Sequence, residues 1–209
     1  MKIGILISGR GSNMAAIVEA VQSGFIPDSE VVAVISDKTS AEGLIKAKEC
    51  EIETLIVTRK GRTRGEHDAE IISELKKRNV ELVCLAGYMR LLSKDFVRAF
   101  PNRIINIHPS LLPSFKGLEA QRQAIEYGVK VSGCTVHFVD ESLDNGAIIA
   151  QKVVEVKDDD TPETLSARIL EYEHTLYVDS VKLIVEGNYQ VNGRRVTAAV
   201  KNYQNKQDV

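Results

Sequence analysis

Residues 103–113, RIINIHPSLLP, are the stretch that says most about how this chain folds. Ile105 and Ile107 alternate with Asn106 and His108, so an extended strand would turn both polar side chains to one face. Pro109 cannot donate to a central ladder and disfavours helix at the preceding residue, so the strand should stop there. The sequence therefore predicts a buried strand with a carboxamide and an imidazole together at its carboxyl end.

Further apolar runs precede this strand and alternate with segments of helical spacing. The strand-like runs are 3–7, 31–35, 54–57 and 82–86, and the helical segments are 14–22, 41–50 and 66–78. This βαβα alternation predicts an α/β fold, a doubly wound and mostly parallel sheet with helices on both faces. Ligands of such sheets bind beyond the carboxyl ends of the strands, so the loops after Ser8, Ala86 and Ile107 should meet at one cleft.

The second half of the chain has a different pattern. Residues 135–139 and 148–156 predict two antiparallel strands around a loop that contains Asp144-Asn-Gly146. Thr161-Pro162 predicts the start of a long helix that ends near Glu186. Residues 189–196 predict a hairpin with a type I′ turn, and the polar tail 202–209 is expected to fray.

The composition is that of an ordinary globular chain of 209 residues, 44% hydrophobic and 27% charged. A net charge of −2 gives no electrostatic case for nucleic acid or an anionic membrane as the main partner. No segment approaches the roughly 20 apolar residues that span a bilayer, and the start lacks a signal-peptide pattern. We therefore expect a cytoplasmic protein. Cys50, Cys84 and Cys134 lack metal-ligand spacing and should be packing residues, and no second cluster joins Asp158-Asp-Asp160 into a metal site.

A glycine-rich segment, Ser8-Gly-Arg-Gly11-Ser12-Asn13, lies between the first strand and the first helix. Its glycines let backbone N–H groups approach an anion, and Ser12 with Asn13 could cap the helix. Met14 stands where the dinucleotide fingerprint needs glycine, and the P-loop lysine is absent. A phosphomonoester therefore fits better than a pyrophosphate or a triphosphate. The alternative is a tight turn that binds nothing.

Asn106 and His108 could stabilise an oxyanion and move a proton, or they could simply be hydrogen-bonded residues at a strand end. Asp144 lies in a sequence that forms turns in its own right. It could also reach His108, where an ionised carboxylate would favour the imidazolium. His137 shares a face with Thr135 on the neighbouring strand, and a satisfied core histidine is a better interpretation there than a catalytic one.

Other candidate residues also have two interpretations each. The basic run 59–64 is either a solvated loop or places Arg64 against an anionic ligand tail. The cluster Met89 to Leu92 either walls a flat aromatic ligand or packs the next helix, which Ser93 caps. His67 is expected at the surface, and His174 could be structural or face a ligand.

Together, these segments resemble the folate-dependent phosphoribosylglycinamide formyltransferase family of purine synthesis. The segments that carry the resemblance, in family order and spacing, are 8–13, 85–92, 106–113, 135–139 and 144–146. Segment 106–113 alone marks the wider group of formyltetrahydrofolate-using enzymes. The resemblance implies a Rossmann-like formyltransferase fold with an antiparallel C-terminal extension. It also implies a single domain over 1–209, made of a phosphate-binding half (1–100), a catalytic and folate half (101–187), and a hairpin and tail (188–209).

The resemblance further implies transfer of the formyl group of 10-formyltetrahydrofolate to the amine of glycinamide ribonucleotide, without a metal. Asn106, His108 and Asp144 match the family's catalytic trio. The implied nucleotide-binding residues are Gly11, Ser12, Asn13, Leu170, Glu171, Tyr172 and Glu173. The implied folate-binding residues are Arg64, Met89, Arg90, Leu91, Leu92, Asn106, Asp140, Glu141, Ser142, Leu143 and Asp144. The partners would be these two small molecules, with no nucleic acid or membrane, and the protein would be a monomer or a homodimer.

The chain departs from the common family pattern at Lys116 and Ala147, which replace prolines, and at Glu119, which replaces a histidine. Loop rigidity and substrate contacts near Gly117 are expected to differ as a result. The nearest enzymatic alternatives are formyltetrahydrofolate hydrolase, which has an additional N-terminal domain, and methionyl-tRNA formyltransferase, which has an additional C-terminal domain and basic character. A rival of another class is a non-catalytic phosphometabolite-binding module, although such a module would not need the trio.

Overall fold

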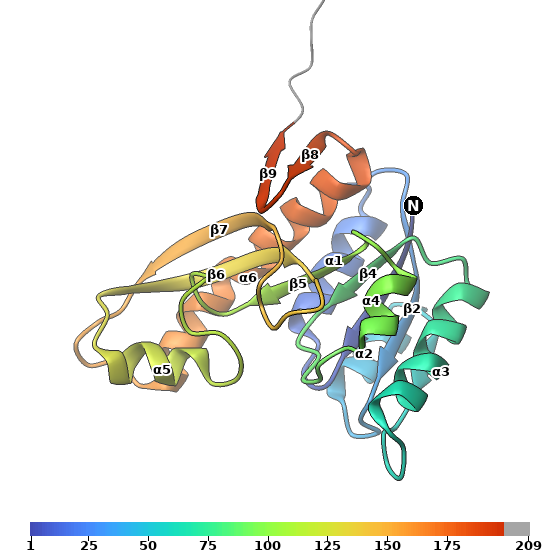
Figure 1. Ribbon diagram of the computed structural model, residues 1–209, viewed down its shortest axis with the longest axis horizontal. Helices are drawn as coiled ribbons and strands as arrows, with labels where there is room; N and C mark the ends of the chain where they lie inside the picture. Colours follow the sequence, from blue (N-terminus) through green and yellow to red (C-terminus); the bar gives the residue numbers. More distant parts are fainter. Residues whose placement is uncertain (199–209) are drawn as a thin grey trace, which may run out of the picture.

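In the computed structural model, which describes residues 1–198, one nine-stranded sheet runs through the molecule (Figure 1). Its first part is parallel and has the spatial order β3-β2-β1-β4-β5. The strands are β1 (Lys2–Ile7), β2 (Glu30–Ser36), β3 (Thr54–Ile56), β4 (Leu82–Leu85) and β5 (Ile104–His108). The predicted doubly wound, mostly parallel sheet is confirmed.

Beyond β5 the sheet continues with β6 (Val131–Phe138) and β7 (Ile148–Glu155), each antiparallel to the strand before it. A hairpin of β8 (Tyr189–Asn192) and β9 (Arg195–Ala198) then adds to β7 through β9. The antiparallel C-terminal extension is therefore confirmed. The tail 202–209 lies outside the described residues.

The turn of this hairpin differs from the expected type I′. Asn192 pairs with Arg195, so Gly193 and Arg194 are the central residues of the turn. Only Gly193 of these two has a positive φ, at 60°. A type I′ turn needs positive φ at both central positions, whereas type II′ needs it only at the first. The turn is therefore of the type II′ kind.

Helices cover both faces of the sheet. On one face lie α1 (Ser12–Gln22), α2 (Glu42–Glu49), α5 (Ala120–Tyr127) and α6 (Pro162–Glu186), and on the other lie α3 (Arg64–Lys77) and α4 (Lys94–Ala99). Figure 1 shows α3 and α4 together at one side of the sheet, and the long α6 leading to the hairpin. Within residues 1–198, no helix is both long enough and apolar enough to cross a membrane.

The start and end of α6 follow the predicted signals. Thr161 forms a capping box with Thr164, Pro162 occupies the first turn, and Gly187 ends the helix with a positive φ of 68°. In contrast, no helix was predicted between residues 109 and 134, where α5 lies. It ends at Gly128, which also has a positive φ of 79°.

The alternation on β5 decides which side chains reach the site. Ile105 and Ile107 are buried in the core beneath α6, so Asn106 and His108 point to the opposite face. Tyr177 of α6 fastens this part of the sheet, because its hydroxyl lies 3.1 Å from the backbone oxygens of both Leu85 and Ile105. One buried phenol therefore ties together β4 and β5 just before the loops that follow them.

Candidate active site

Asn106 and His108 meet their neighbours on β6 through the antiparallel register. Asn106 pairs with His137, and His108 pairs with Thr135. The Thr135 hydroxyl donates to the Ser110 backbone oxygen at 2.6 Å and accepts from the Leu112 backbone N–H at 3.0 Å. The turn that follows His108 is therefore held against β6, which fixes the end of the strand.

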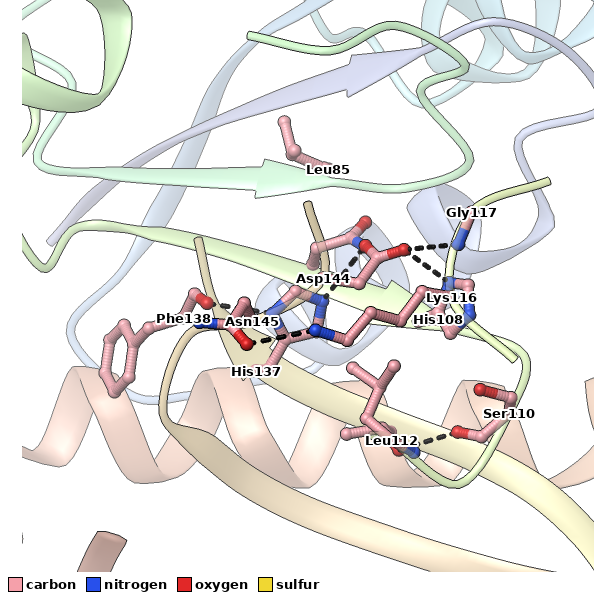
Figure 2. Close-up of polar contacts among 12 residues, drawn as sticks. Leu85, His108, Ser110, Leu112, Lys116, Gly117, His137, Phe138, Asp144 and Asn145 are labelled. Atoms are coloured by element: carbon pink, nitrogen blue, oxygen red, sulfur yellow. Dashed lines mark hydrogen bonds and ion pairs between the residues drawn. The ribbon is translucent and has the colours of Figure 1, made fainter. Parts of the chain in front are cut away.

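The imidazole of His108 is buried and faces two acceptors, of which Figure 2 shows Asp144. Its Nε2 lies 2.8 Å from the Phe115 backbone oxygen, which can only accept, so Nε2 carries a proton. Its Nδ1 lies 3.5 Å from Oδ2 of Asp144, which also accepts from the Gly117 N–H at 2.8 Å. The structure thus brings His108 and Asp144 together beside Asn106. Each ring nitrogen of His108 thus faces an oxygen.

His137 belongs to the same cluster but has the opposite hydrogen-bonding pattern. Its Nδ1 donates to the Phe138 backbone oxygen at 2.8 Å, which leaves Nε2 to accept from Asn106 Nδ2 at 3.3 Å. Burial lowers the pKa of His137, so the ring is neutral near pH 7. The prediction of a satisfied core histidine agrees with this geometry. What the sequence interpretation missed is that its partner is Asn106, although the shared face with Thr135 was a signal.

The loop that carries Asp144 depends on a close backbone approach. Asp144 has a positive φ of 44°, an uncommon conformation for a residue with a side chain. A Cβ at Gly146 would collide with the Phe138 backbone oxygen, so only glycine fits at this crossing. Next to the carboxylate, Asn145 Oδ1 accepts from Lys116 Nζ at 3.0 Å and from Arg194 Nη1 at 2.9 Å. Lys116, where the family pattern has proline, therefore ties this loop to the one that contains Gly117.

The glycine-rich loop differs from the expectation in its cap. Gly11 is the N-cap of α1 with φ at 70°, and a Cβ there would lie 2.6 Å from the Cα of Gly43. Ser12 and Asn13 already lie within the helix, and no side chain caps it. The expected capping by these two residues was wrong, because the close Gly11–Gly43 contact fixes the helix start. The first backbone N–H groups of α1 therefore have no side-chain cap, which is the arrangement that suits an anion.

Asn13 instead contacts α6. Its Nδ2 donates to Glu173 Oε2 at 2.7 Å, and its Oδ1 is buried without a partner. Burial raises the pKa of Glu173, while the hydrogen bond from Asn13 opposes that rise. Asn13 and Glu173, predicted from distant parts of the chain as nucleotide-binding residues, thus lie in direct contact.

A cavity of about 450 Å³ lies between the glycine-rich loop, which contributes Arg10, and the first turns of α6. Its lining includes Arg10, Glu119, Gln121, Arg122, Ser166 and Leu170. Leu170 therefore lies near the glycine-rich loop, as does Glu119, one of the departures from the family pattern. Tyr172 faces elsewhere, because Lys152 Nζ of β7 lies 5.2 Å from the centre of its ring, and Glu171 is exposed. The nucleotide-binding role of these two residues stays a prediction.

The loop after β4 has features of both predictions made for it, a ligand-facing wall and packing against the next helix. Met89 and Leu91 are 57% and 51% exposed, as a ligand-facing wall would be. Tyr88 is buried and Leu92 packs against the core beneath α3 and α4. Ser93 caps α4 as predicted, by accepting from the Phe96 N–H. The loop thus packs one side and leaves the other side open.

The remaining predicted folate residues are spread over two places. Arg64 is exposed in the first turn of α3, and no ion pair involves it within residues 1–198. Glu141 is turned toward α4, where Oε1 lies 3.1 Å from Arg98 Nε, and Asp140 Oδ1 accepts from the Ser142 N–H at 2.8 Å. Leu143 is exposed on the same loop. These contacts do not join Arg64 to the loop of Asp144.

His67 is not at the surface, which corrects the expectation for it. Its ring is buried, with Nε2 2.8 Å from the Val57 backbone oxygen and Nδ1 3.3 Å from Asp68 Oδ1. Cys84 and Cys134 are buried, and burial raises the pKa of the Cys134 thiol to about 12, as expected of packing residues. Among the described residues, no group of three or more His, Cys, Asp or Glu side chains could hold a metal ion.

Comparison with known proteins shows which family and which structures this chain resembles. Residues 1–181 match the protein family described as formyl transferase. The crystal structure of glycinamide ribonucleotide transformylase 1 from Symbiobacterium toebii is 49% identical, with a TM-score of 0.93 over 95% of this chain and 93% of that one. The phosphoribosylglycinamide formyltransferase of Haemophilus influenzae is 41% identical over 191 residues, which make up 91% of this chain and 90% of the relative.

A longer relative matches over one part only. The trifunctional purine biosynthetic protein adenosine-3 of Gallus gallus is 46% identical over 194 residues, and this chain spans only 19% of its length. For the corresponding protein of Chironomus tentans the share is 14%. The matches nevertheless cover nearly all of this chain, and the chain belongs to the formyl transferase family.

Proposed function

We propose that the chain transfers the formyl group of 10-formyltetrahydrofolate to the amine of glycinamide ribonucleotide, a step of purine synthesis. The observation that carries the proposal is the meeting of Asn106, His108 and Asp144 at the carboxyl end of β5. The names of the family and of the similar proteins support formyl transfer to glycinamide ribonucleotide. Both partners are small molecules, and the chain acts as a monomer or a homodimer.

The proposed reaction is a direct attack of one substrate on the other. The neutral amine of the nucleotide forms a bond to the formyl carbon, and the carbonyl oxygen takes up negative charge. An N–H of Asn106 and the Nδ1–H of His108 donate to this oxyanion, an effect worth about 3–4 kcal/mol for each well-placed donor. His108 Nδ1 lies 3.5 Å from Asp144 Oδ2, which is longer than a normal hydrogen bond, so its N–H is not committed to the carboxylate.

The collapse of the intermediate then completes the transfer. The bond from the formyl carbon to the folate nitrogen breaks, and the attacking amine loses a proton while the folate nitrogen gains one. His108 and Asp144 assist this proton transfer, directly or through water. Asp144 also balances the charge on the imidazolium, and His137 holds Asn106 from the other side. The sequence of steps needs neither a covalent enzyme intermediate nor a metal.

The nucleotide and the folate are proposed to approach from opposite sides of the trio. The uncapped start of α1 would receive the phosphate, with Gly11, Ser12 and Asn13 as its contacts and Leu170 to Glu173 beside the rest of the nucleotide. The exposed Met89 and Leu91 would contact the folate ring, while Arg64 and residues 140–144 would complete that side.

The test is to incubate the purified chain with 10-formyltetrahydrofolate labelled in the formyl carbon, with and without glycinamide ribonucleotide. We expect the label in the nucleotide, and loss of the formyl donor only when the nucleotide is present. Release of labelled formate without the nucleotide would indicate the hydrolase instead. Binding of both molecules without turnover would indicate a non-catalytic module and would overturn the proposal.

A further inference from the structure

Two buried carboxylates that none of the roles above uses lie beneath the loop 87–93, which follows β4. They are Asp37, just after β2, and Asp68, on α3. The loop exposes Met89 and Leu91 on its outer side, whereas its backbone and Arg90 are bonded inward.

Asp37 joins this loop to the glycine-rich loop. Its Oδ2 lies 2.6 Å from Arg90 Nε, and its Oδ1 accepts from the Ser8 hydroxyl at 2.6 Å. The same Ser8 oxygen accepts from the Met89 backbone N–H at 2.9 Å, and the Ser8 N–H donates to the Gly87 oxygen at 3.1 Å. Asp37 therefore holds both the start of the glycine-rich loop and the middle of the loop after β4.

Asp68 holds only the far end of the loop. Its Oδ2 accepts from the Ser93 backbone N–H at 2.6 Å, and its Oδ1 faces His67 Nδ1 at 3.3 Å. Tyr88, on the same loop, has a buried hydroxyl without a hydrogen-bond partner among the described residues. Burial raises the pKa of Tyr88, and the charges of Asp37 and Asp68 add to that rise. The phenol therefore lies within the influence of both.

Packing alone does not account for these two aspartates. An ionised carboxylate taken out of water loses several kcal/mol of hydration, which only full hydrogen bonding and a counter-charge can offset. Apolar side chains could fill the same space without that cost. What apolar side chains cannot do is bind Arg90 and the backbone N–H groups at defined places.

We infer that Asp37 and Asp68 are positioning residues for the ligand-binding loop 87–93, and that Asp37 also positions the glycine-rich loop. Asp37 thus sets the geometry of both substrate sites, while Asp68 sets that of one. The inference rests on the proposed function, because that function assigns the nucleotide to the glycine-rich loop and the folate to the loop after β4.

The test compares Asp37→Asn with Asp68→Asn by the KM of each substrate. We expect Asp37→Asn to raise the KM for glycinamide ribonucleotide and for 10-formyltetrahydrofolate, each by about tenfold, the size that follows from losing a hydrogen bond to a charged group. Asp68→Asn should raise only the KM for the folate. Asp159→Asn, at an exposed carboxylate far along the chain, is the control and should change neither.

A general loss of stability would reduce the amount of active enzyme without producing this pattern of KM values. Unchanged KM values in Asp37→Asn, or a change for the folate alone, would overturn the inference. If Asp37→Asn does not fold, Ser8→Ala replaces it, because it removes only the Ser8 link, and it should raise both KM values by a smaller factor. No change for either substrate in Ser8→Ala would then count as the overturning result. Failure of the proposed function is separate, since the unmodified chain would not formylate the nucleotide at all.

Discussion

Within residues 1–198, the buried pairs His67–Asp68 and His108–Asp144 have nearly the same local geometry. In both, Nε2 lies 2.8 Å from a backbone oxygen and Nδ1 faces the carboxylate. The first pair is sealed, with side chains 1% and 3% exposed, whereas those of the second are 6% and 11% exposed. A buried histidine–aspartate pair is therefore not by itself a sign of catalysis.

The two pairs differ in how far their polar atoms are already hydrogen-bonded within the fold. His67 Nδ1 is hydrogen-bonded to Asp68 at 3.3 Å, and the other oxygen of Asp68 is taken by the Ser93 N–H. His108 Nδ1 is 3.5 Å from Asp144, and the amide of Asn106 lies on the same face of β5. In the first pair both ring nitrogens and both carboxylate oxygens are hydrogen-bonded within the fold, whereas in the second pair His108 Nδ1 has no normal hydrogen bond.

The largest expected effect is on kcat, and it should follow replacement of the histidine in only one of the two pairs. We expect His108→Ala to lower kcat by about a hundredfold or more, because an oxyanion donor and proton carrier is lost, with nucleotide binding nearly unchanged. His67→Ala should instead lower the free energy of unfolding by about 2 kcal/mol, because the Val57 oxygen and Asp68 lose a buried partner. Steady-state kinetics and urea unfolding of both variants provide the measurements.

Either of two results would contradict this comparison. One is an unchanged kcat in His108→Ala. The other is a loss of kcat in folded His67→Ala as large as the one in His108→Ala, which would mean that the sealed pair also serves the reaction.

A second variant examines the carboxylate of the open pair. Asp144→Asn keeps the size and can still accept from the Gly117 N–H, but it removes the charge that faces His108. We expect kcat to fall by about tenfold, since the imidazolium loses its counter-charge. The corresponding change in the sealed pair, Asp68→Asn, should act on the KM for the folate instead. The same changes in kcat and KM in Asp144→Asn and Asp68→Asn would contradict the proposed difference between the two pairs.

A smaller effect is expected at Lys116, which contacts Asn145 next to Asp144 of the His108–Asp144 pair. Lys116→Met keeps most of the side-chain length but breaks the bond to Asn145, next to the catalytic carboxylate. We expect kcat to fall by about threefold because the loop of Asp144 becomes less well held. In the double variant with Asn145→Ala the loss should be no greater than in Asn145→Ala alone, since Asn145→Ala already removes the Lys116 contact together with the Arg194 contact. Independent, multiplying losses would show that Lys116 acts in another way.

The smallest effect concerns pH and the third imidazole of the comparison, His137. Burial lowers its pKa from the ordinary 6.5, so the unfolded chain takes up the proton more readily than the folded one. The stability that this group contributes is therefore complete above pH 6.5 and is lost as the pH falls below it. We expect His137→Asn to flatten the decrease in unfolding free energy between about pH 6.5 and pH 5, relative to the parent chain. Parallel curves for the two proteins would contradict this assignment.

Much of the fold could be predicted from the sequence because local signals agreed with the tertiary structure. The apolar runs of β1 to β5, and the Thr161-Pro162 start and Gly187 end of α6, needed no distant partner to be recognised. The facing of Asn106 and His108 followed from alternation alone. These are cases in which the chain's own periodicity decides the outcome.

The predictions that were wrong concern residues whose local structure depends on a contact with a distant part of the chain. His67 lies in a charged helical stretch, but its ring is buried against the backbone oxygen of Val57, just after β3. The cap of α1 passes to Gly11 because Gly43, from another helix, packs against it. The hairpin turn is not of type I′, because Asn192 pairs with Arg195 and only Gly193 of the two central residues has a positive φ. Sequence patterns carry no direct record of such partners.

The central claim is that Asn106 and His108 act on the same reacting oxygen, and a double-mutant cycle on kcat tests it most directly. The measurement compares Asn106→Ala, His108→Ala and the variant that carries both, under saturating substrates. If the two groups stabilise one oxyanion as a unit, the double variant should lose about as much as the worse single variant. Losses that multiply in full would show that the two side chains serve separate events, which would contradict the account.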